Sequence, residues 1–293
     1  MIHTIENNFL KVSVQHIGAE ICSITSKKTD KEFMWDANPE IWGSYSPVLF
    51  PIIGALKNNT YTYQAASYSV PKHGFIRNNR QLEIESKTPE QLVLKYHYND
   101  ESLKMYPFKF VFYISFHLIK NKVTISHYVE NLGDNEMFFS VGAHPAFKCP
   151  INSNEEYEDY YIEFEEKETA QTWELASGGL TSGKTHMVLN NSNKLFLTKQ
   201  LFANDALIFK ELKSKKVSLK SENGKDKINI HFSDFNYLGI WAKPNAPFVC
   251  IEPWLGITDD INSTGEIERK EGMLRLAPEK SFTAEYSIEI NEN

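Results

Sequence analysis

The chain has 293 residues, of which 41% are hydrophobic and 24% charged, a composition typical of a folded globular protein with a substantial core. A formal net charge of −7 disfavours nucleic acid and anionic membrane surfaces as partners. The three cysteines lack metal-type spacing, and there is no signal-peptide pattern or apolar run of bilayer length, so we expect a soluble cytoplasmic protein.

Apolar and polar residues alternate along much of the chain, which is the pattern of half-buried β-strands. The first such stretch begins at Leu10, and the clearest is 108–118, where aromatic and aliphatic residues share one face. A short polar link joins this stretch to 123–129, so the two are predicted to form a hairpin. Further strands are predicted at 92–98, 228–232 and 282–290, and short helical turns at 38–42 and 100–106.

Strands joined by short turns, without crossover helices, predict an all-β fold in which antiparallel sheets form a sandwich or barrel. No Gly/Ser-rich or Pro-rich linker divides the sequence, so residues 1–293 are expected to form a single domain. The acidic run 154–168 is interrupted by aromatic and aliphatic residues, which predicts a strand with a solvated face. A sheet with one broad face free would suit an extended polar ligand.

Two ionisable residues, each followed by a proline, are the strongest candidates for chemistry. Glu252 follows the apolar stretch 248–251, and Pro253 favours extended backbone for it, so we expect Glu252 at a strand end. Partial desolvation there would raise the pKa of the carboxyl group and strengthen it as a base. His144 lies among small residues before Pro145, an arrangement that lets a ligand approach the backbone. Either residue alone is compatible with a structural role, and the repeated pattern favours a joint one.

Other polar and aromatic residues would complete a ligand site. Trp254 and Phe147 offer flat apolar rings of the kind that cover the C–H face of a sugar. His73 is suited to donate a hydrogen bond to a substrate oxygen, and Arg77 to contact a pair of hydroxyls or an anion. Asp205 precedes an apolar strand, where it either caps a turn or binds the ligand.

Four short motifs in a fixed order resemble those of the aldose 1-epimerase (galactose mutarotase-like) superfamily. They are His-Gly-Phe-Ile-Arg at 73–77, Gly-Ala-His-Pro-Ala-Phe at 142–147, Asn-Asp-Ala at 204–206 and Cys-Ile-Glu-Pro-Trp at 250–254. The likeness covers nearly the whole chain and is greatest for a bacterial branch found in sugar-utilisation gene clusters. It implies an antiparallel β-supersandwich with few short helices and a site on its concave face.

The resemblance also implies roles for individual residues. Glu252 would be the general base and His144 the general acid, with His73, Arg77 and Asp205 binding sugar oxygens. Anomer interconversion removes a proton from the C1 hydroxyl and gives one to the ring oxygen, so a carboxylate and an imidazolium suffice without cofactor or metal. A neighbouring carboxylate, Asp205 or Glu252, is expected to help keep His144 protonated near neutral pH. The expected partner is a small neutral aldose, and a homodimer is compatible with these features.

Several alternatives stay open from the sequence. The hexose-phosphate branch would carry a further arginine where 43–47 has none, so a phosphorylated sugar is disfavoured. The prolines after His144 and Glu252 depart from the galactose-type branch, which leaves the aldose unidentified. A glycoside hydrolase would use Asp205 and Glu252, and a metal enzyme would combine His73, His144 and Glu252. A sugar-binding protein without turnover would need only the aromatic rings and the hydrogen-bond donors.

Overall fold

The computed structural model describes residues 1–292, and its regular structure is almost entirely antiparallel β-sheet. Within this range lie a nine-stranded sheet, a six-stranded sheet and three smaller ones. The predicted all-β, antiparallel fold class is confirmed. None of the helices in residues 1–292 is both long and apolar enough to cross a bilayer.

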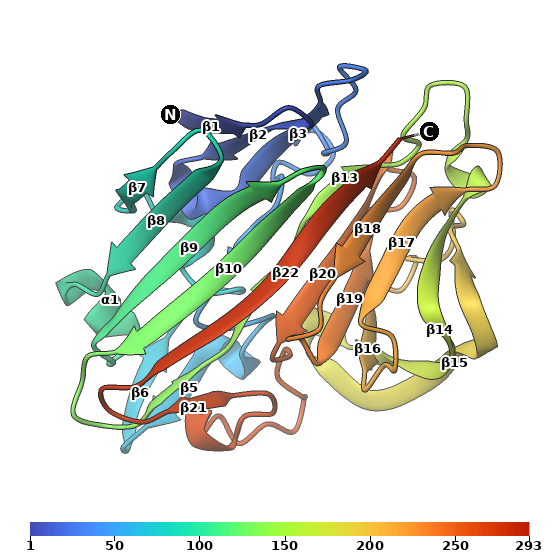
Figure 1. Cartoon of the computed structure of the whole chain (residues 1–293). Helices are drawn as coiled ribbons and strands as arrows, with labels where there is room; N and C mark the ends of the chain where they lie inside the picture. The colour runs from blue at the N-terminus through green and yellow to red at the C-terminus, as the bar shows by residue number, and fades with distance from the viewer. Residues whose placement is uncertain (293) are drawn as a thin grey trace.

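The two large sheets carry most of the chain. In order across it, the nine-stranded sheet contains β15 (Thr181–Phe196), β14 (Tyr160–Leu175), β17 (Lys216–Ser221), β18 (Lys227–His231), β22 (Ser281–Asn291), β10 (Lys122–Asn131), β9 (Phe110–Ile119), β8 (Gln91–His97) and β7 (Glu83–Lys87). The six-stranded sheet contains β16 (Leu207–Lys210), β19 (Tyr237–Trp241), β20 (Phe248–Leu255), β12 (Val141–Ala143) and β4 (Val48–Leu49), and β13 (Ala146–Lys148) also pairs with β20. In Figure 1 the nine-stranded sheet crosses the view from β7 through β22 (red) to β14 and β15.

Three smaller sheets and several short helical elements complete the fold. The remaining strands are β1 (Ile2–Glu6), β2 (Leu10–Gln15) and β3 (Ile21–Ser26) in one sheet, β5 (Thr60–Tyr63) with β6 (Ala66–Ser69), and β11 (Met137–Phe139) with β21 (Leu274–Leu276). The α-helix within the described range is α1 (Asp100–Met105). Short 3₁₀ turns are η1 (Ile17–Ala19), η2 (Lys57–Asn59), η3 (Ile76–Asn78), η4 (Tyr157–Asp159), η5 (Ser177–Gly179) and η6 (Ile267–Arg269).

Local sequence pattern accounts for the long strands. In β9, Phe112, Ile114 and Phe116 are buried on one face while His117 is exposed on the other, as the alternation predicts. Strand β10 pairs with β9 in the predicted hairpin. The helical turn predicted at 100–106 is α1, whose first backbone N–H groups are capped by the side chain of Asn99.

Aromatic side chains join the core layers. The ring of Phe50, just after β4, stacks on that of Phe112 in β9, with the two centroids 4.4 Å apart. Phe112 also stacks on the imidazole of His127 in β10, and that imidazole stacks in turn on the ring of Tyr286 in β22. Neither ring nitrogen of the buried His127 has a hydrogen-bond partner within residues 1–292, and burial lowers its pKa to about 3. His127 is therefore a neutral core residue rather than a surface titrating group.

Candidate active site

Strand β20 is the element that carries the predicted base. All eight of its residues are buried, and Glu252 lies inside the strand, which continues through Pro253 to Leu255. The prediction of a strand end at Glu252 was therefore wrong. The neighbouring strand is interrupted there: β12 pairs with β20 beyond Pro253, β13 pairs with it before Glu252, and His144 lies between them. In this gap Ile251 donates its backbone N–H to the carbonyl oxygen of Pro145. Backbone N–H groups two residues apart point to the same side of a strand, so the nitrogen of Pro253 also faces the gap. The N–H that proline lacks therefore removes no hydrogen bond between strands.

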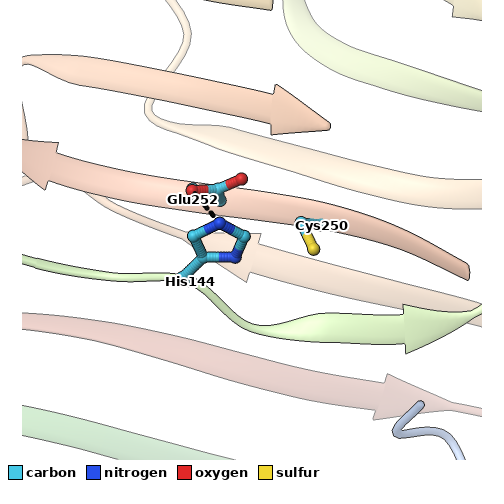
Figure 2. A group of neighbouring side chains, drawn as sticks. All are labelled: His144, Cys250 and Glu252. Carbon is cyan, nitrogen blue, oxygen red and sulfur yellow. Dashed lines mark ion pairs between the residues drawn. The ribbon is translucent and has the colours of Figure 1, made fainter. Parts of the chain in front are cut away.

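The same interruption directs His144 toward β20. Its backbone N–H bonds to the carbonyl of Pro47, 3.0 Å away, rather than to β20. The loop that contains Pro47 is held in turn by the buried carboxylate of Glu20, which accepts the N–H groups of Tyr45 and Ser46. The imidazole Nε2 of His144 lies 3.2 Å from Oε2 of Glu252, and Figure 2 shows the two side chains in contact.

Two glycines near Glu252 leave space for an indole ring rather than for a ligand. A Cβ at Gly239, the residue opposite Glu252 in β19, would lie 2.7 Å from the ring of Trp254. A Cβ at Gly142 would lie 2.8 Å from the same ring. Both glycines are therefore required by the packing of Trp254, whereas the sequence suggested that the small residues beside His144 admit the ligand.

A cavity of about 380 Å³ opens over the Glu252–His144 pair, within the range of small-molecule sites. Of the predicted site residues, six line it: His73, Arg77, His144, Asp205, Glu252 and Trp254. Phe147 does not, because its fully buried side chain packs in the main hydrophobic core. The structure thus brings together residues from four separate sequence motifs but leaves Phe147 outside.

Two further tryptophans line the cavity and enclose His144. The indole of Trp42 stacks on the imidazole with centroids 5.1 Å apart, and Trp241 meets it edge-on at 5.8 Å. The backbone of Trp42 is fixed by the Nε1–H of Trp35, which bonds to its carbonyl oxygen at 2.8 Å. The sequence motifs did not point to Trp42 or Trp241 as site residues. The helical turn predicted at 38–42 ends on Trp42, and the hydrogen bond from Trp42 N–H to the carbonyl oxygen of Asn38 confirms that turn.

His73 and Arg77 approach the cavity from a strained loop. His73 has a positive φ of 66°, an unusual conformation for a residue other than glycine. Its Nδ1 accepts the N–H of Gly54 at 3.2 Å, and burial lowers its pKa well below the ordinary histidine value, so Nε2 keeps the proton as a donor. Arg77, half-buried in η3, donates to Ser44 Oγ at 3.4 Å, while its buried Nε has no partner within residues 1–292.

The mouth of the cavity carries the most exposed polar groups. Asp205 is exposed with a φ of 80°, and its Oδ1 accepts the N–H of Ala206 at 2.7 Å, the turn-capping role considered from sequence. Lys72 also lines the cavity and lies against Gly179 at the tip of the β14–β15 hairpin. That tip is tied down by Thr258, whose hydroxyl donates to the carbonyl of Gly179 at 2.7 Å.

Burial controls the protonation of the central pair. It raises the pKa of Glu252 well above the ordinary glutamate value, an effect that the positive charges of Lys72 and Arg77 only partly offset. This confirms the direction predicted for Glu252. Burial also lowers the pKa of His144 to about 3, with Arg77 acting in the same direction. The expectation of a protonated His144 is thus wrong for the free protein, because burial disfavours both the imidazolium and the carboxylate that was expected to stabilise it.

The residues that could bind a metal differ from the set of His73, His144 and Glu252 considered from sequence. Within residues 1–292, the cluster of potential metal ligands contains Cys250 in place of His73: one ligand atom each from His144, Cys250 and Glu252 lies within 4.8 Å of the others. Cys250 and Glu252 alternate with Ile251 and so share one face of β20. His73 is not part of this cluster, and its Nδ1 already accepts the N–H of Gly54.

Comparison with known proteins gives a consistent family. The model of the aldose 1-epimerase family matches residues 1–275. Protein LacX of Lactococcus lactis is 30% identical over 98% of both chains. A galactose mutarotase related enzyme from Lactobacillus acidophilus superimposes with a TM-score of 0.95, at 40% identity over 100% of this chain and 98% of that one. A galactose mutarotase-like protein from Lactobacillus casei superimposes with a TM-score of 0.93, at 26% identity over 99% of this chain and 100% of the other.

Proposed function

The chain belongs to the aldose 1-epimerase family, and we propose that it interconverts the α and β anomers of an aldose at the Glu252–His144 pair. Family and fold support a sugar-binding, mutarotase-like activity, of the isomerase class. The observation that carries the proposal is the 3.2 Å contact between the two side chains on the floor of the cavity.

Adjacent proton-transfer groups suit this reaction because its two reacting oxygens are bonded to the same carbon. Ring opening takes a proton from the C1 hydroxyl and gives one to the ring oxygen. Rotation about the C1–C2 bond and reclosure then give the other anomer, with the proton transfers reversed. In our proposal Glu252 is the base toward the C1 hydroxyl and His144 the acid toward the ring oxygen.

This assignment requires that Glu252 and His144 together carry one proton. It does not matter which of the two holds that proton before the sugar binds. In the free site burial favours the neutral forms of both groups, a protonated carboxyl group and an uncharged imidazole. Moving the proton across the 3.2 Å contact gives a carboxylate and an imidazolium with the same total charge. A bound aldose favours that second form, because its C1 hydroxyl donates to the carboxylate and its ring oxygen accepts from the imidazolium. The indole of Trp42, stacked on His144, also stabilises the cation.

The remaining lining residues supply binding and orientation. Trp42, Trp241 and Trp254 offer apolar ring surface for the C–H faces of the sugar. The Nε2–H of His73 and the guanidinium of Arg77 are the donors for ring hydroxyls, and Asp205 is an acceptor at the mouth. We propose no role for Phe147, since a fully buried ring cannot contact a sugar.

One observation favours a second candidate substrate class. Lys72 and Arg77 both line the cavity, so two cations face the ligand rather than the one expected from sequence. A phosphorylated aldose is therefore the alternative to a neutral one, with the same chemistry at C1.

Polarimetry on freshly dissolved sugars tests the proposal. The parent protein is expected to speed the approach to anomeric equilibrium over the buffer rate for at least one member of a panel of aldoses and aldose phosphates. Calorimetric titration with the same panel measures binding alone. Tight binding of a sugar without acceleration on any member would reject catalysis and leave a sugar-binding protein. Acceleration restricted to phosphates would select the second candidate.

A further inference from the structure

Cys250 is a buried thiol beside the reactive pair that the proposed reaction does not use. It has no accessible surface, and its side chain packs with Trp35, Phe248 and Ala146. Figure 2 shows its sulfur on the same side of β20 as Glu252, next to the imidazole of His144. The Nδ1 atom of His144, on the Cys250 side of the ring in that view, is buried and has no hydrogen-bond partner within residues 1–292.

We propose that His144, Cys250 and Glu252 form a binding site for a thiophilic divalent cation, Zn²⁺ in the first instance, that switches the reaction off. One imidazole nitrogen, one thiolate and one carboxylate oxygen are the three donor types that zinc takes in proteins. A thiolate excludes the hard cations Mg²⁺ and Ca²⁺, which require oxygen ligands.

The separations are close to those of a zinc site. Zinc–ligand bonds of 2.0–2.3 Å in a tetrahedron place the ligand atoms about 3.3–3.6 Å apart. The Nε2 atom of His144 and Oε2 of Glu252 are already 3.2 Å apart, and one ligand atom from each of the three residues lies within 4.8 Å of the other two. Closure by about 1 Å, within the reach of side-chain rotation, brings all three into the coordination sphere. His144 and Glu252 line the cavity, which provides the entry route and a fourth position for water.

Charge balance also favours the exchange. With the thiol of Cys250 protonated and one proton on the Glu252–His144 pair, the site without metal has no net charge. Zn²⁺ displaces one proton from Cys250 and one from the pair, and both go to the buffer. The product contains a dication, a thiolate, a carboxylate and a neutral imidazole, so the buried site again has no net charge. An uncompensated buried charge, which is the usual cost of such a site, does not arise.

Metal binding itself does not depend on the proposed function, whereas the inhibition does. A bound ion would occupy the base and the acid together, so it would stop proton transfer to and from the sugar. Excess chelator would restore activity.

Titration with Zn²⁺ and Co²⁺ tests the site, with Cys149→Ser as matched control because Cys149 is a second fully buried thiol that is not in the cluster. We expect parent and Cys149→Ser to bind one equivalent of Zn²⁺, and their Co²⁺ complexes to show thiolate-to-metal charge-transfer absorption. Cys250→Ser should bind Zn²⁺ at least about tenfold more weakly, since even outer-shell partners contribute 10–100-fold. Its Co²⁺ complex should lack the band, and its mutarotation should persist at Zn²⁺ concentrations that stop the parent.

Equal Zn²⁺ affinity of Cys250→Ser and the parent would overturn the proposal, as would a parent Co²⁺ complex without the thiolate band. The second result needs no variant, so a Cys250→Ser protein that fails to fold does not prevent the test. Zn²⁺ that binds as expected but leaves the rate unchanged would overturn the inhibitory role. A parent that binds Zn²⁺ through Cys250 but speeds no aldose would overturn the proposed function alone.

Discussion

Replacing Glu252 by glutamine removes the proton acceptor while preserving the shape of a fully buried side chain. The amide can still contact His144 at about the present 3.2 Å, so the cavity should keep its form and the sugar most of its affinity. A positioned proton-transfer group contributes about 10²–10⁴ in rate, equivalent to about 2.7–5.4 kcal/mol of transition-state stabilisation. We expect Glu252→Gln to lower kcat/KM by that factor, mainly through kcat.

A double-substitution cycle with His144→Asn separates a cooperating pair from two independent groups. Independent effects would multiply, to about 10⁴–10⁸ in total. Removal of a proton without donation is of little use, so the double variant should be only slightly slower than either single one. Initial rates come from polarimetry after subtraction of the buffer rate, with Glu168→Gln as control, because Glu168 is buried on β14 away from the cavity. A folded Glu252→Gln protein as fast as the parent, or strictly multiplicative effects, would refute the paired mechanism.

Three further outcomes follow from the same structure. The active pair holds one proton, gains a second only near the His144 pKa of about 3 and loses the first above the raised pKa of Glu252. The rate should therefore fall at these two limits and show no limb near pH 6.5; a limb at 6.5 that disappears in His144→Asn would contradict this. Trp42→Leu should raise KM by about 2- to 10-fold, more than it lowers kcat, since ring stacking is worth about 0.5–1.5 kcal/mol; an unchanged KM in steady-state NMR assays would remove Trp42 from the binding surface. His127 has a folded pKa of about 3 against 6.5 when unfolded, so stability is full above pH 6.5 and declines by up to about 1.4 kcal/mol per pH unit below it. His127→Phe should flatten this decline in urea unfolding measured between pH 7 and 5, and equal slopes for the two proteins would show that His127 does not cause it.

Strand content could be predicted from sequence because alternation is a local property. The faces of β9 and β10 follow directly from their residues, as does the short helix α1. The extent of β20 was harder to predict from sequence. Pro253 suggested a strand end, but the gap between β12 and β13 accommodates a proline inside the sheet. That gap depends on pairing between distant segments, which alternation does not report.

The site shows the same division between local and long-range information. The motifs located His144 and Glu252, but the depth of their burial, and hence the neutral state of His144, depends on the indoles packed around them. Phe147 was proposed as a flat ring for sugar stacking because it is an aromatic residue near His144 in sequence, whereas the fold buries it in the core. Cys250 was within reach of sequence reasoning, because it is two residues before Glu252 on the same face of β20.

A single proton on the Glu252–His144 pair is the centre of the mechanism, and carbon-13 NMR of the glutamate side-chain carboxyl groups tests it most directly. Protein labelled at that carbon is titrated with pH, and the signal absent from Glu252→Gln identifies Glu252. Burial predicts that this carboxyl titrates well above the ordinary glutamate value of 4.5. Addition of a saturating aldose should then shift the signal toward the carboxylate position. Titration at or below 4.5 in the free protein would contradict the one-proton pair.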